Sequence, residues 1–182
     1  MQKPADYQDP KTVEVMFSAQ QIAERIDSLA NEIVSTIGKD FIIVGLLRGS
    51  FVFTADLIRA LHKHGAEPQI DFMTLSSYGI RKEGGNLITI ERDIADDVMD
   101  RTVLIVDDIL ESGRTLDYAR TIMLKRGAKI LKICVLLEKP GKRRAEVEAN
   151  FVGFMVPDRF VVGFGLDYAN FYRELPFIGA LD

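Results

Sequence analysis

The sequence predicts an α/β fold in which a central parallel sheet is flanked by helices and a small subdomain lies beside it. Uninterrupted apolar runs of strand length alternate with amphipathic segments of helix length, which is typical of parallel βαβ units covered on both faces. Roughly the last forty residues lack this alternation and read as short strands. With 182 residues, of which 47% are hydrophobic, the chain is long enough for one domain with a substantial core.

The first regular element is a predicted helix over residues 18–38. Ser18 and Gln21 have the spacing of a capping box, and Gly38 supplies a stop signal at the C-terminal end. Apolar residues recur at intervals of three and four and therefore share one helix face: Ile22, Ile26, Leu29, Ile33 and Ile37.

Strands and helices then alternate along the chain. We expect strands at 41–47, 70–77, 87–91, 101–108 and 129–138, and helices at 50–65 and 115–127. Residues 78–86 are polar and rich in glycine, which favours a loop. Residues 151–157 and 160–168 read as short strands separated by Pro157, and we expect both in the small subdomain.

Charge and cysteine content limit the class of protein. A net charge of −4 argues against broad nucleic-acid binding, which favours a basic face. The single cysteine, Cys134, lies in an apolar run with no metal-ligand spacing around it. Residues 1–20 lack the apolar core of a signal peptide, and the longest apolar run, 41–47, is too short to span a bilayer. We expect a cytoplasmic protein that has neither a membrane nor nucleic acid as a partner.

Three unusual segments follow predicted strands of the sheet. They read "LLRGS" at 46–50, "SSYG" at 76–79 and "DDILESGRT" at 107–115. In an open parallel sheet, ligands bind beyond the carboxyl ends of the strands. The convergence of the three segments on that edge predicts a binding site there.

The third segment has the chemistry of a site for a sugar phosphate. Backbone N–H groups at a strand-to-helix turn form an anion site, and the hydroxyls of Ser112 and Thr115 add donors. Asp107 and Asp108 offer only acceptors, so they suit the neighbouring hydroxyls of a sugar or a magnesium ion. A phosphate cradle beside acceptors for a diol indicates ribose 5-phosphate.

The stretch "VLIVDDILESGRTL", residues 103–116, resembles the signature with which type I phosphoribosyltransferases bind 5-phosphoribosyl 1-pyrophosphate (PRPP). Four further segments resemble the hypoxanthine (hypoxanthine-guanine) branch of that family in its short bacterial form: "LLRGSF", "LSSYG", "LLEKPGKR" and "VPDRFVVGFGLDYANFYRELPFIG". The likeness runs in order over roughly residues 13 to 181. It implies a single domain over 1–182 with the type I phosphoribosyltransferase fold. Its core would cover about 18–140, and a hood would consist of the N-terminal segment and about 141–182.

The resemblance also implies roles for the residues around PRPP. Asp107 and Asp108 would hold the ribose hydroxyls. A mobile lid would contain Ser77 and Tyr78. The 5′-phosphate would be wrapped chiefly by main-chain N–H groups of Glu111, Ser112, Gly113, Arg114 and Thr115. Pyrophosphate would contact Leu47, Arg48 and Gly49, and in the family the bond matching Leu47–Arg48 can be a non-proline cis peptide.

On the purine side, the resemblance places Lys139 against the O6 atom of the base. A cationic donor there suits a 6-oxopurine and would face the amino donor of adenine. Phe160 would stack on the ring, and Val161 would offer main-chain atoms to the base edge. Asp167 would contact the base and help Asp107 and Asp108 to hold Mg²⁺, the implied cofactor. Arg173 would reach pyrophosphate with its planar fork.

The implied reaction transfers the phosphoribosyl group from PRPP to N9 of hypoxanthine, and of guanine as a second substrate, in purine salvage. In the family, an aspartate handles the proton at N7 of the base. Glu111 occupies the position of that aspartate here, and we expect Glu111 to take the catalytic role. A homodimer or homotetramer is implied as well. Two alternatives stay open: a xanthine-preferring relative, and an RNA-binding regulator of pyrimidine genes with the same fold.

Overall fold

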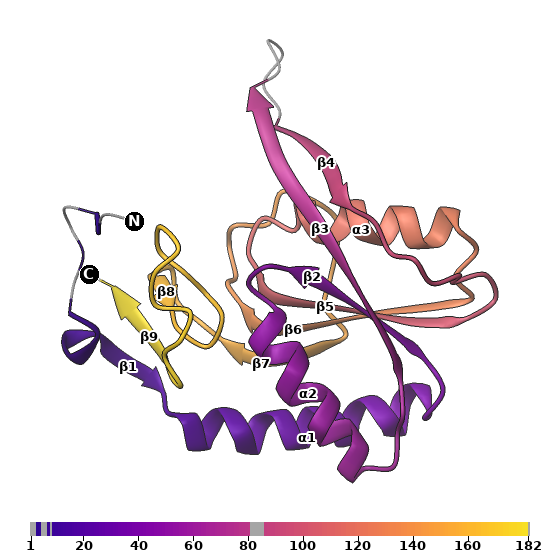
Figure 1. Ribbon diagram of the computed structural model, residues 1–182, viewed down its shortest axis with the longest axis horizontal. Coiled ribbons are helices and arrows are strands. Elements are labelled where there is room, and N and C mark those ends of the chain that lie inside the picture. The colour runs from indigo at the N-terminus through magenta and orange to yellow at the C-terminus, as the bar shows by residue number, and fades with distance from the viewer. Residues whose placement is uncertain (1–2, 5–6, 8, 81–85, 182) are drawn as a thin grey trace.

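Two β-sheets form the frame of the computed structural model, which describes residues 3–4, 7, 9–80 and 86–181 (Figure 1). The side chains of residues 11, 77–80, 86 and 87 lie outside that description. The large sheet has the strand order β4-β3-β2-β5-β6-β7, and the small sheet has the order β1-β9-β8.

The elements have these bounds: a 3₁₀ turn η1 at Pro10–Thr12, then β1 Glu14–Phe17, α1 Ala19–Ile37, β2 Ile42–Leu47, α2 Phe51–Lys63, β3 Gln69–Ile80, β4 Asn86–Arg92, β5 Thr102–Leu110, α3 Arg114–Lys125, β6 Ile130–Glu138, β7 Phe151–Met155, β8 Phe160–Val162 and β9 Ile178–Leu181.

Helix α1 begins and ends where its sequence signals predict. The side chain of Ser18 accepts from the backbone N–H of Gln21 at 3.3 Å, and the Gln21 side chain accepts from the Ser18 N–H at 2.9 Å. Gly38 closes the helix with a φ of 82°, a conformation that glycine adopts without a steric penalty. The predicted apolar face is buried, apart from partly buried Ile37.

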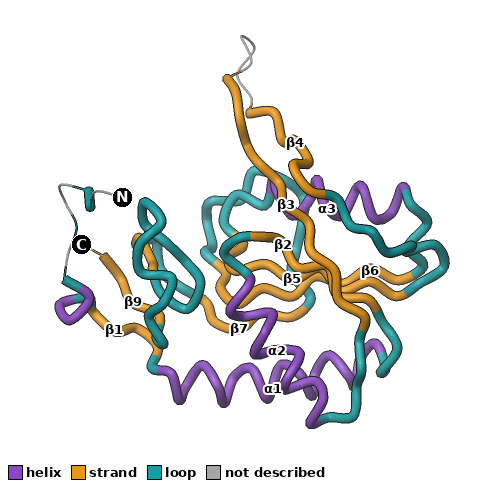
Figure 2. Tube along the Cα trace, viewed as in Figure 1, coloured by secondary structure: helices purple, strands orange, loops and turns teal. Residues whose placement is uncertain are grey.

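Both faces of the large sheet are covered, as the continuous apolar strands predict. In β2, Ile43 packs into the core beneath α1 and α2, whereas Ile42 and Val44 pack into a second core beneath α3. Figure 2 shows α1 and α2 on one side of the sheet and α3 on the other. The described residues include no helix with the length and apolar character to cross a membrane.

The order in which the strands are added to the large sheet reverses at its centre. Strand β2 pairs in parallel with β3 on one side and with β5 on the other. The chain then continues outward from β5 through the parallel strands β6 and β7, while β4 is an antiparallel edge strand. A crevice beyond the carboxyl ends of β2 and β5 is therefore the expected ligand site.

Strands β3 and β4 extend into the loop predicted over 78–86, of which residues 81–85 lie outside the described part of the structure. Tyr78 pairs with Leu87 and Ile80 pairs with Asn86, so the antiparallel ladder continues beyond the body of the sheet as a hairpin. Backbone pairing between adjacent strands here overrides the polar composition. Ser77 and Tyr78, the predicted lid residues, belong to β3, and their side chains lie outside the described part of the structure.

The prediction that residues 151–157 lie in the small subdomain is wrong. Strand β7 pairs in parallel with β6, with Phe151 opposite Cys134, and forms an edge of the large sheet. The chain between β6 and β7 returns to the middle of β6, where Phe151 pairs with Cys134, and sequence periodicity does not reveal this return. The small sheet instead joins β8 to β9, and β9 to β1 from the N-terminal segment.

Candidate active site

The carboxyl ends of β2 and β5 enclose a cavity of about 260 Å³. From β2 and the turn after it come Leu47, Arg48 and Gly49, and the Leu47–Arg48 peptide bond is cis, one of the forms that the family resemblance allows. The other predicted site residues in its lining come from β5, the following turn and the start of α3: Asp107, Asp108, Glu111, Ser112, Gly113 and Thr115. The fold thus brings together two of the segments that the sequence singles out.

Gly49 allows the β2 turn to approach the carboxylate of Asp108. A Cβ atom at Gly49 would lie 1.6 Å from Oδ2 and 2.5 Å from Cγ of Asp108, so no other residue fits beside this carboxylate in its present position. The Asp108 carboxylate is fixed from its own strand as well, because Oδ1 accepts from the backbone N–H of Ile109 at 2.8 Å.

The two adjacent carboxylates are buried at an electrostatic cost. Asp107 is only 9% exposed, and burial together with the negative charge of Asp108 raises the pKa of Asp107 well above its ordinary value. Burial also raises the pKa of Asp108, against the opposing influence of hydrogen bonds and the positive charge of Arg173. Donors or a cation supplied by a ligand would relieve this cost.

The turn after β5 presents backbone N–H groups. Gly113 caps α3 with a φ of 77°, and the helix begins at Arg114, one residue earlier than predicted. The Arg114 N–H lies 3.5 Å from the hydroxyl oxygen of Ser112. The side chain of Arg114 lines a neighbouring hollow rather than the main cavity. The geometry is that of an anion site at a helix N-terminus.

A second cavity of about 200 Å³ adjoins the first and brings together the predicted purine-site residues Lys139, Phe160, Val161 and Asp167. Both cavities are lined by Asp108, Ile109 and Glu111, which stand between them. Sequence reasoning did not find Ile109 or Leu166, which also line the second cavity. An apolar residue in a predicted strand can line a cavity or pack in the core, and the sequence does not distinguish the two locations.

Lys139 directly follows β6 and is almost completely buried, with 6% exposure. Its backbone N–H donates to the carbonyl oxygen of Leu110 at 3.0 Å, which holds the residue beside the β5 turn. Its Nζ atom lies 3.3 Å from Oε2 of Glu111. The cavity therefore presents a cationic donor and an anionic acceptor side by side. Phe160 lines the same cavity, is 51% exposed and meets Tyr168 edge to face.

Arg173, in the C-terminal segment, is connected to the site through Asp167 but lines neither of the two site cavities; it lines a separate cavity beside α2. Its guanidinium lies 2.6 Å from Oδ1 of Asp167, while Oδ2 of Asp167 accepts from the backbone N–H of Asn170 at 2.7 Å. Arg173 also donates to the carbonyl oxygen of Gly165 at 2.6 Å. A Cβ at Gly165 would lie 2.3 Å from the carbonyl oxygen of Gly49, so this segment packs directly on the β2 turn.

The donor set fits Mg²⁺ carried by a phosphorylated ligand rather than by a protein cage. Among the described residues, no group of three or more potential metal ligands comes together. Asp107 and Asp108 are nevertheless buried neighbours with raised pKa values, which a cation would stabilise in the charged form. Mg²⁺ commonly uses one or two carboxylates together with substrate phosphates and waters.

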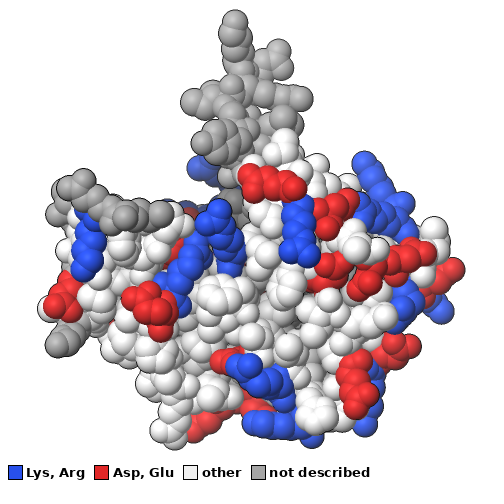
Figure 3. All heavy atoms as spheres, in the orientation of Figure 1, with Lys and Arg blue, Asp and Glu red and all other residues white. Residues whose placement is uncertain are grey.

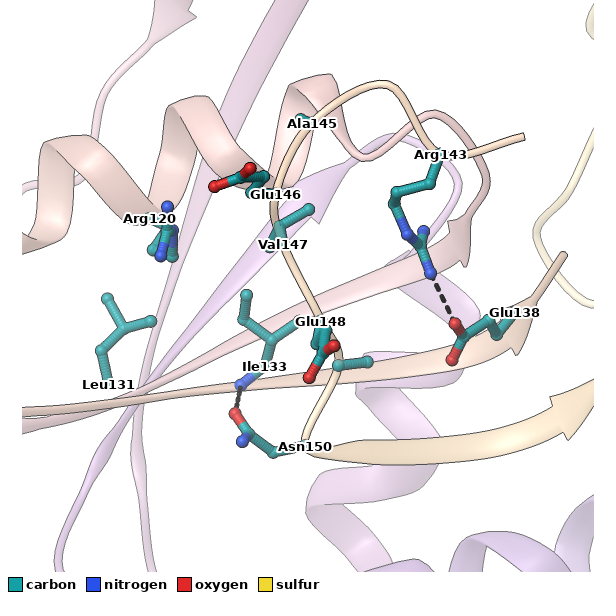
Figure 4. A pocket seen from close by; sticks show the side chains of 11 residues that line it. Arg120, Leu131, Ile133, Glu138, Arg143, Ala145, Glu146, Val147, Glu148 and Asn150 are labelled. Carbon is teal, nitrogen blue, oxygen red and sulfur yellow. Dashed lines mark hydrogen bonds and ion pairs between the residues drawn. The ribbon is translucent and has the colours of Figure 1, made fainter. Parts of the chain in front are cut away.

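A larger cavity of about 870 Å³ lies beside α3 and contains none of the predicted site residues (Figure 4). Arg120, Arg143, Glu138 and Glu146 supply charged side chains to its wall. Arg143 connects this cavity to the site, because it also donates to the carbonyl oxygen of Glu111 at 3.2 Å.

The chain is similar to known proteins over most of its length. The sequence pattern described as the phosphoribosyl transferase domain matches residues 13–169. The chain is 46% identical over 171 residues to hypoxanthine phosphoribosyltransferase of Escherichia coli strain K12, covering 92% of this chain and 94% of the relative. It is 42% identical to hypoxanthine-guanine phosphoribosyltransferase of Bacillus subtilis strain 168, with 92% of each chain covered. A crystal structure of a hypoxanthine phosphoribosyltransferase from Staphylococcus aureus superimposes with a TM-score of 0.86 at 38% identity, covering 93% of this chain and 91% of that one.

Proposed function

This chain belongs to the phosphoribosyltransferase family, and from that membership we propose that it is a purine-salvage enzyme of the hypoxanthine phosphoribosyltransferase type. It transfers the 5-phosphoribosyl group from PRPP to N9 of hypoxanthine, and also of guanine, to give IMP or GMP and pyrophosphate. The fold is the type I phosphoribosyltransferase fold.

The observation that carries the choice of base is the pairing of Lys139 with Glu111 at 3.3 Å. The O6 and N7 atoms lie next to each other on one edge of a purine. In a 6-oxopurine, O6 accepts a hydrogen bond while a protonated N7 donates one. An adjacent ammonium and carboxylate match this pattern, whereas the amino group of adenine would place a donor against Lys139.

The proposed reaction forms the bond between N9 and C1′ and breaks the bond between C1′ and the pyrophosphate oxygen, which leaves with the electron pair. Glu111 accepts the proton released from N7. Phe160 stacks on the base, and Val161 reads its edge through main-chain atoms. The position of Glu111 on the border of both cavities supports its contact with base and ribose at once.

PRPP occupies the first cavity in this proposal. Asp107 and Asp108 accept hydrogen bonds from the ribose hydroxyls, and the main-chain N–H groups of residues 111–115 bind the 5′-phosphate. Pyrophosphate lies against residues 47–49 and receives Arg173. Ser77 and Tyr78 belong to a lid that excludes water from the reaction.

Asp107 and Asp108 would hold Mg²⁺, and Asp167 would join them. Both oxygens of Asp167 already have partners, so its contribution requires an exchange. Movement of Arg173 from Asp167 to pyrophosphate would free one carboxylate oxygen. When bound, Mg²⁺ neutralises the charge of the leaving pyrophosphate.

The alternatives have less support. No relative named above is a xanthine enzyme or an RNA-binding regulator. On the face drawn in Figure 3, acidic and basic side chains are interspersed, unlike the single-sign basic face that RNA binding favours. We further propose a cytoplasmic homodimer or homotetramer, which sedimentation of the purified protein tests. A monomer at all concentrations would contradict the assembly.

The activity is tested by incubating the protein with PRPP, MgCl₂ and hypoxanthine. We expect IMP and pyrophosphate in equal amounts, and no pyrophosphate release when the base is omitted. Release of pyrophosphate without a base, or the absence of IMP, would contradict the proposal. Parallel incubations with xanthine, and filter binding of RNA at physiological salt, test the two alternatives.

A further inference from the structure

The segment that follows Lys139 donates hydrogen bonds to the turn after β5. Arg143 donates through Nη1 to the carbonyl oxygen of Glu111 at 3.2 Å. The backbone N–H groups of Arg144 and Ala145 donate to the carbonyl oxygen of Ser112 at 2.9 and 3.2 Å. Two consecutive carbonyl groups of the turn therefore point toward residues 143–145.

This arrangement fixes the direction of the N–H groups that the proposed function uses. In a trans peptide, the C=O and the following N–H point in opposite directions. Leu47–Arg48 is the one cis bond in the described ranges, so the two peptides of the turn are trans. The N–H groups of Ser112 and Gly113 consequently point away from residues 143–145, as a cradle for the 5′-phosphate requires.

Arg143 is itself held on the sheet. Its Nη2 atom lies 2.5 Å from Oε1 of Glu138, the last residue of β6, and both side chains are largely buried. Figure 4 shows the Arg143 side chain extending along the cavity wall toward Glu138. The turn packs closely on this side chain, since a Cβ at Gly113 would lie 3.2 Å from Cδ of Arg143.

We propose that Arg143 is a positioning residue for PRPP. Its guanidinium, anchored on Glu138, orients the Glu111–Ser112 peptide so that the Ser112 N–H faces the 5′-phosphate. The planar fork of arginine bonds a carboxylate and a carbonyl group at once in a fixed geometry, which the single ammonium of lysine does less well. The inference deepens the proposed function and rests on it.

The test compares Arg143→Met, Arg143→Lys and Glu138→Gln with the wild-type enzyme. Methionine keeps an unbranched apolar stem and removes every donor. We expect the KM for PRPP to rise about 10-fold in Arg143→Met, with kcat and the KM for hypoxanthine changed less than about threefold. Arg143→Lys should recover part of the loss, and Glu138→Gln should raise the KM for PRPP by about threefold, because a neutral acceptor holds the guanidinium less firmly.

Arg120→Met is the matched control. Arg120 lines the same cavity, and its guanidinium pairs with Asp117, which is not part of the turn. We expect its KM for PRPP to equal the wild-type value, with melting temperatures of both methionine variants recorded by circular dichroism. An unchanged KM for PRPP in Arg143→Met, or an equal rise in Arg120→Met, would overturn the inference.

Should Arg143→Met fail to fold, Arg143→Lys and Glu138→Gln decide the question by the same KM measurement. Wild-type turnover of PRPP combined with unchanged KM values in these variants would overturn the positioning role alone. Absence of wild-type turnover would overturn the proposed function and, with it, the inference that rests on it.

Discussion

Replacing Gly49 by alanine should disable PRPP binding while leaving the protein folded. The added Cβ would lie 1.6 Å from Oδ2, 2.5 Å from Cγ and 3.2 Å from Oδ1 of Asp108. Since nonbonded carbon and oxygen atoms need about 3.5 Å, the carboxylate must retreat by roughly 2 Å. The short Asp108 side chain can do this only by giving up its bond with the Ile109 N–H or by changing rotamer. The φ of Gly49 lies outside the left-handed region, so alanine adds no backbone strain.

The size of the effect follows from this displacement. Overpacking costs about 1–3 kcal/mol, and each kcal/mol lowers the melting temperature of a chain of this size by about 2–4 °C. A misplacement of about 1 Å in a catalytic site costs about 100-fold in rate. We therefore expect the kcat/KM for PRPP to fall at least 100-fold, while the melting temperature falls by no more than about 12 °C.

Steady-state kinetics with varied PRPP provide the measurement, and Gly45→Ala provides the control. A Cβ at Gly45 would lie 2.8 Å from two ring carbons of Phe72, which overpacks the same strand away from the carboxylates. We expect Gly45→Ala to lose stability but to keep its kcat/KM within about threefold. A kcat/KM for Gly49→Ala within threefold of wild type would refute the placement of Asp108 beside bound ribose.

Three further predictions address other residues. Glu111→Gln should lower kcat by about 10²–10⁴-fold because the acceptor for the N7 proton is lost, and calorimetry should find PRPP binding unchanged; near-normal turnover would exclude the assignment. Lys139→Gln should lower kcat/KM for hypoxanthine by about 10–100-fold but leave the rate with unsubstituted purine nearly unchanged; equal losses with both bases would contradict the contact with O6. Although burial alone would raise it, the pKa of Asp71 is held below its ordinary value by three backbone N–H groups. Its stabilisation is therefore present above the ordinary pKa and lost as pH falls through the lowered one, so Asp71→Asn should cost about 1 kcal/mol in urea unfolding at pH 7 and nothing near pH 2–3. A cost that persists in acid would show that the charge is not responsible.

The elements that the sequence predicts well depend on local signals. Helix α1 ends within one residue of its predicted bounds, because its caps and its apolar face are encoded in adjacent turns. Strands β2, β5 and β6 are predicted because each is buried on both faces. The sheet to which β7 belongs depends on pairing with a strand far along the chain, and composition cannot reveal that pairing.

The candidate site likewise has one part that the local sequence predicts and another that depends on the fold. The strand-to-helix segment 107–115 is recognisable from one continuous stretch, because its small and acidic residues together are typical of a site for a sugar phosphate. The Lys139–Glu111 ion pair joins the residues that directly follow β6 and β5, and Arg143 donates to the Glu111 carbonyl group from 32 residues further along the chain. Sequence spacing predicts neither contact. The basic run at 142–144 has the composition of a solvated surface, and only the fold brings Arg143 to the carbonyl group of Glu111.

The central claim, phosphoribosyl transfer to a 6-oxopurine, is tested most directly by a competition experiment. Equal concentrations of hypoxanthine, guanine, xanthine and adenine share a limiting amount of PRPP with MgCl₂, and mass spectrometry quantifies the four nucleotides. Product ratios then equal the ratios of kcat/KM for the bases. We predict that IMP is the main product, with GMP second and AMP at least about 100-fold below IMP. A mixture in which AMP equals or exceeds IMP would contradict the account.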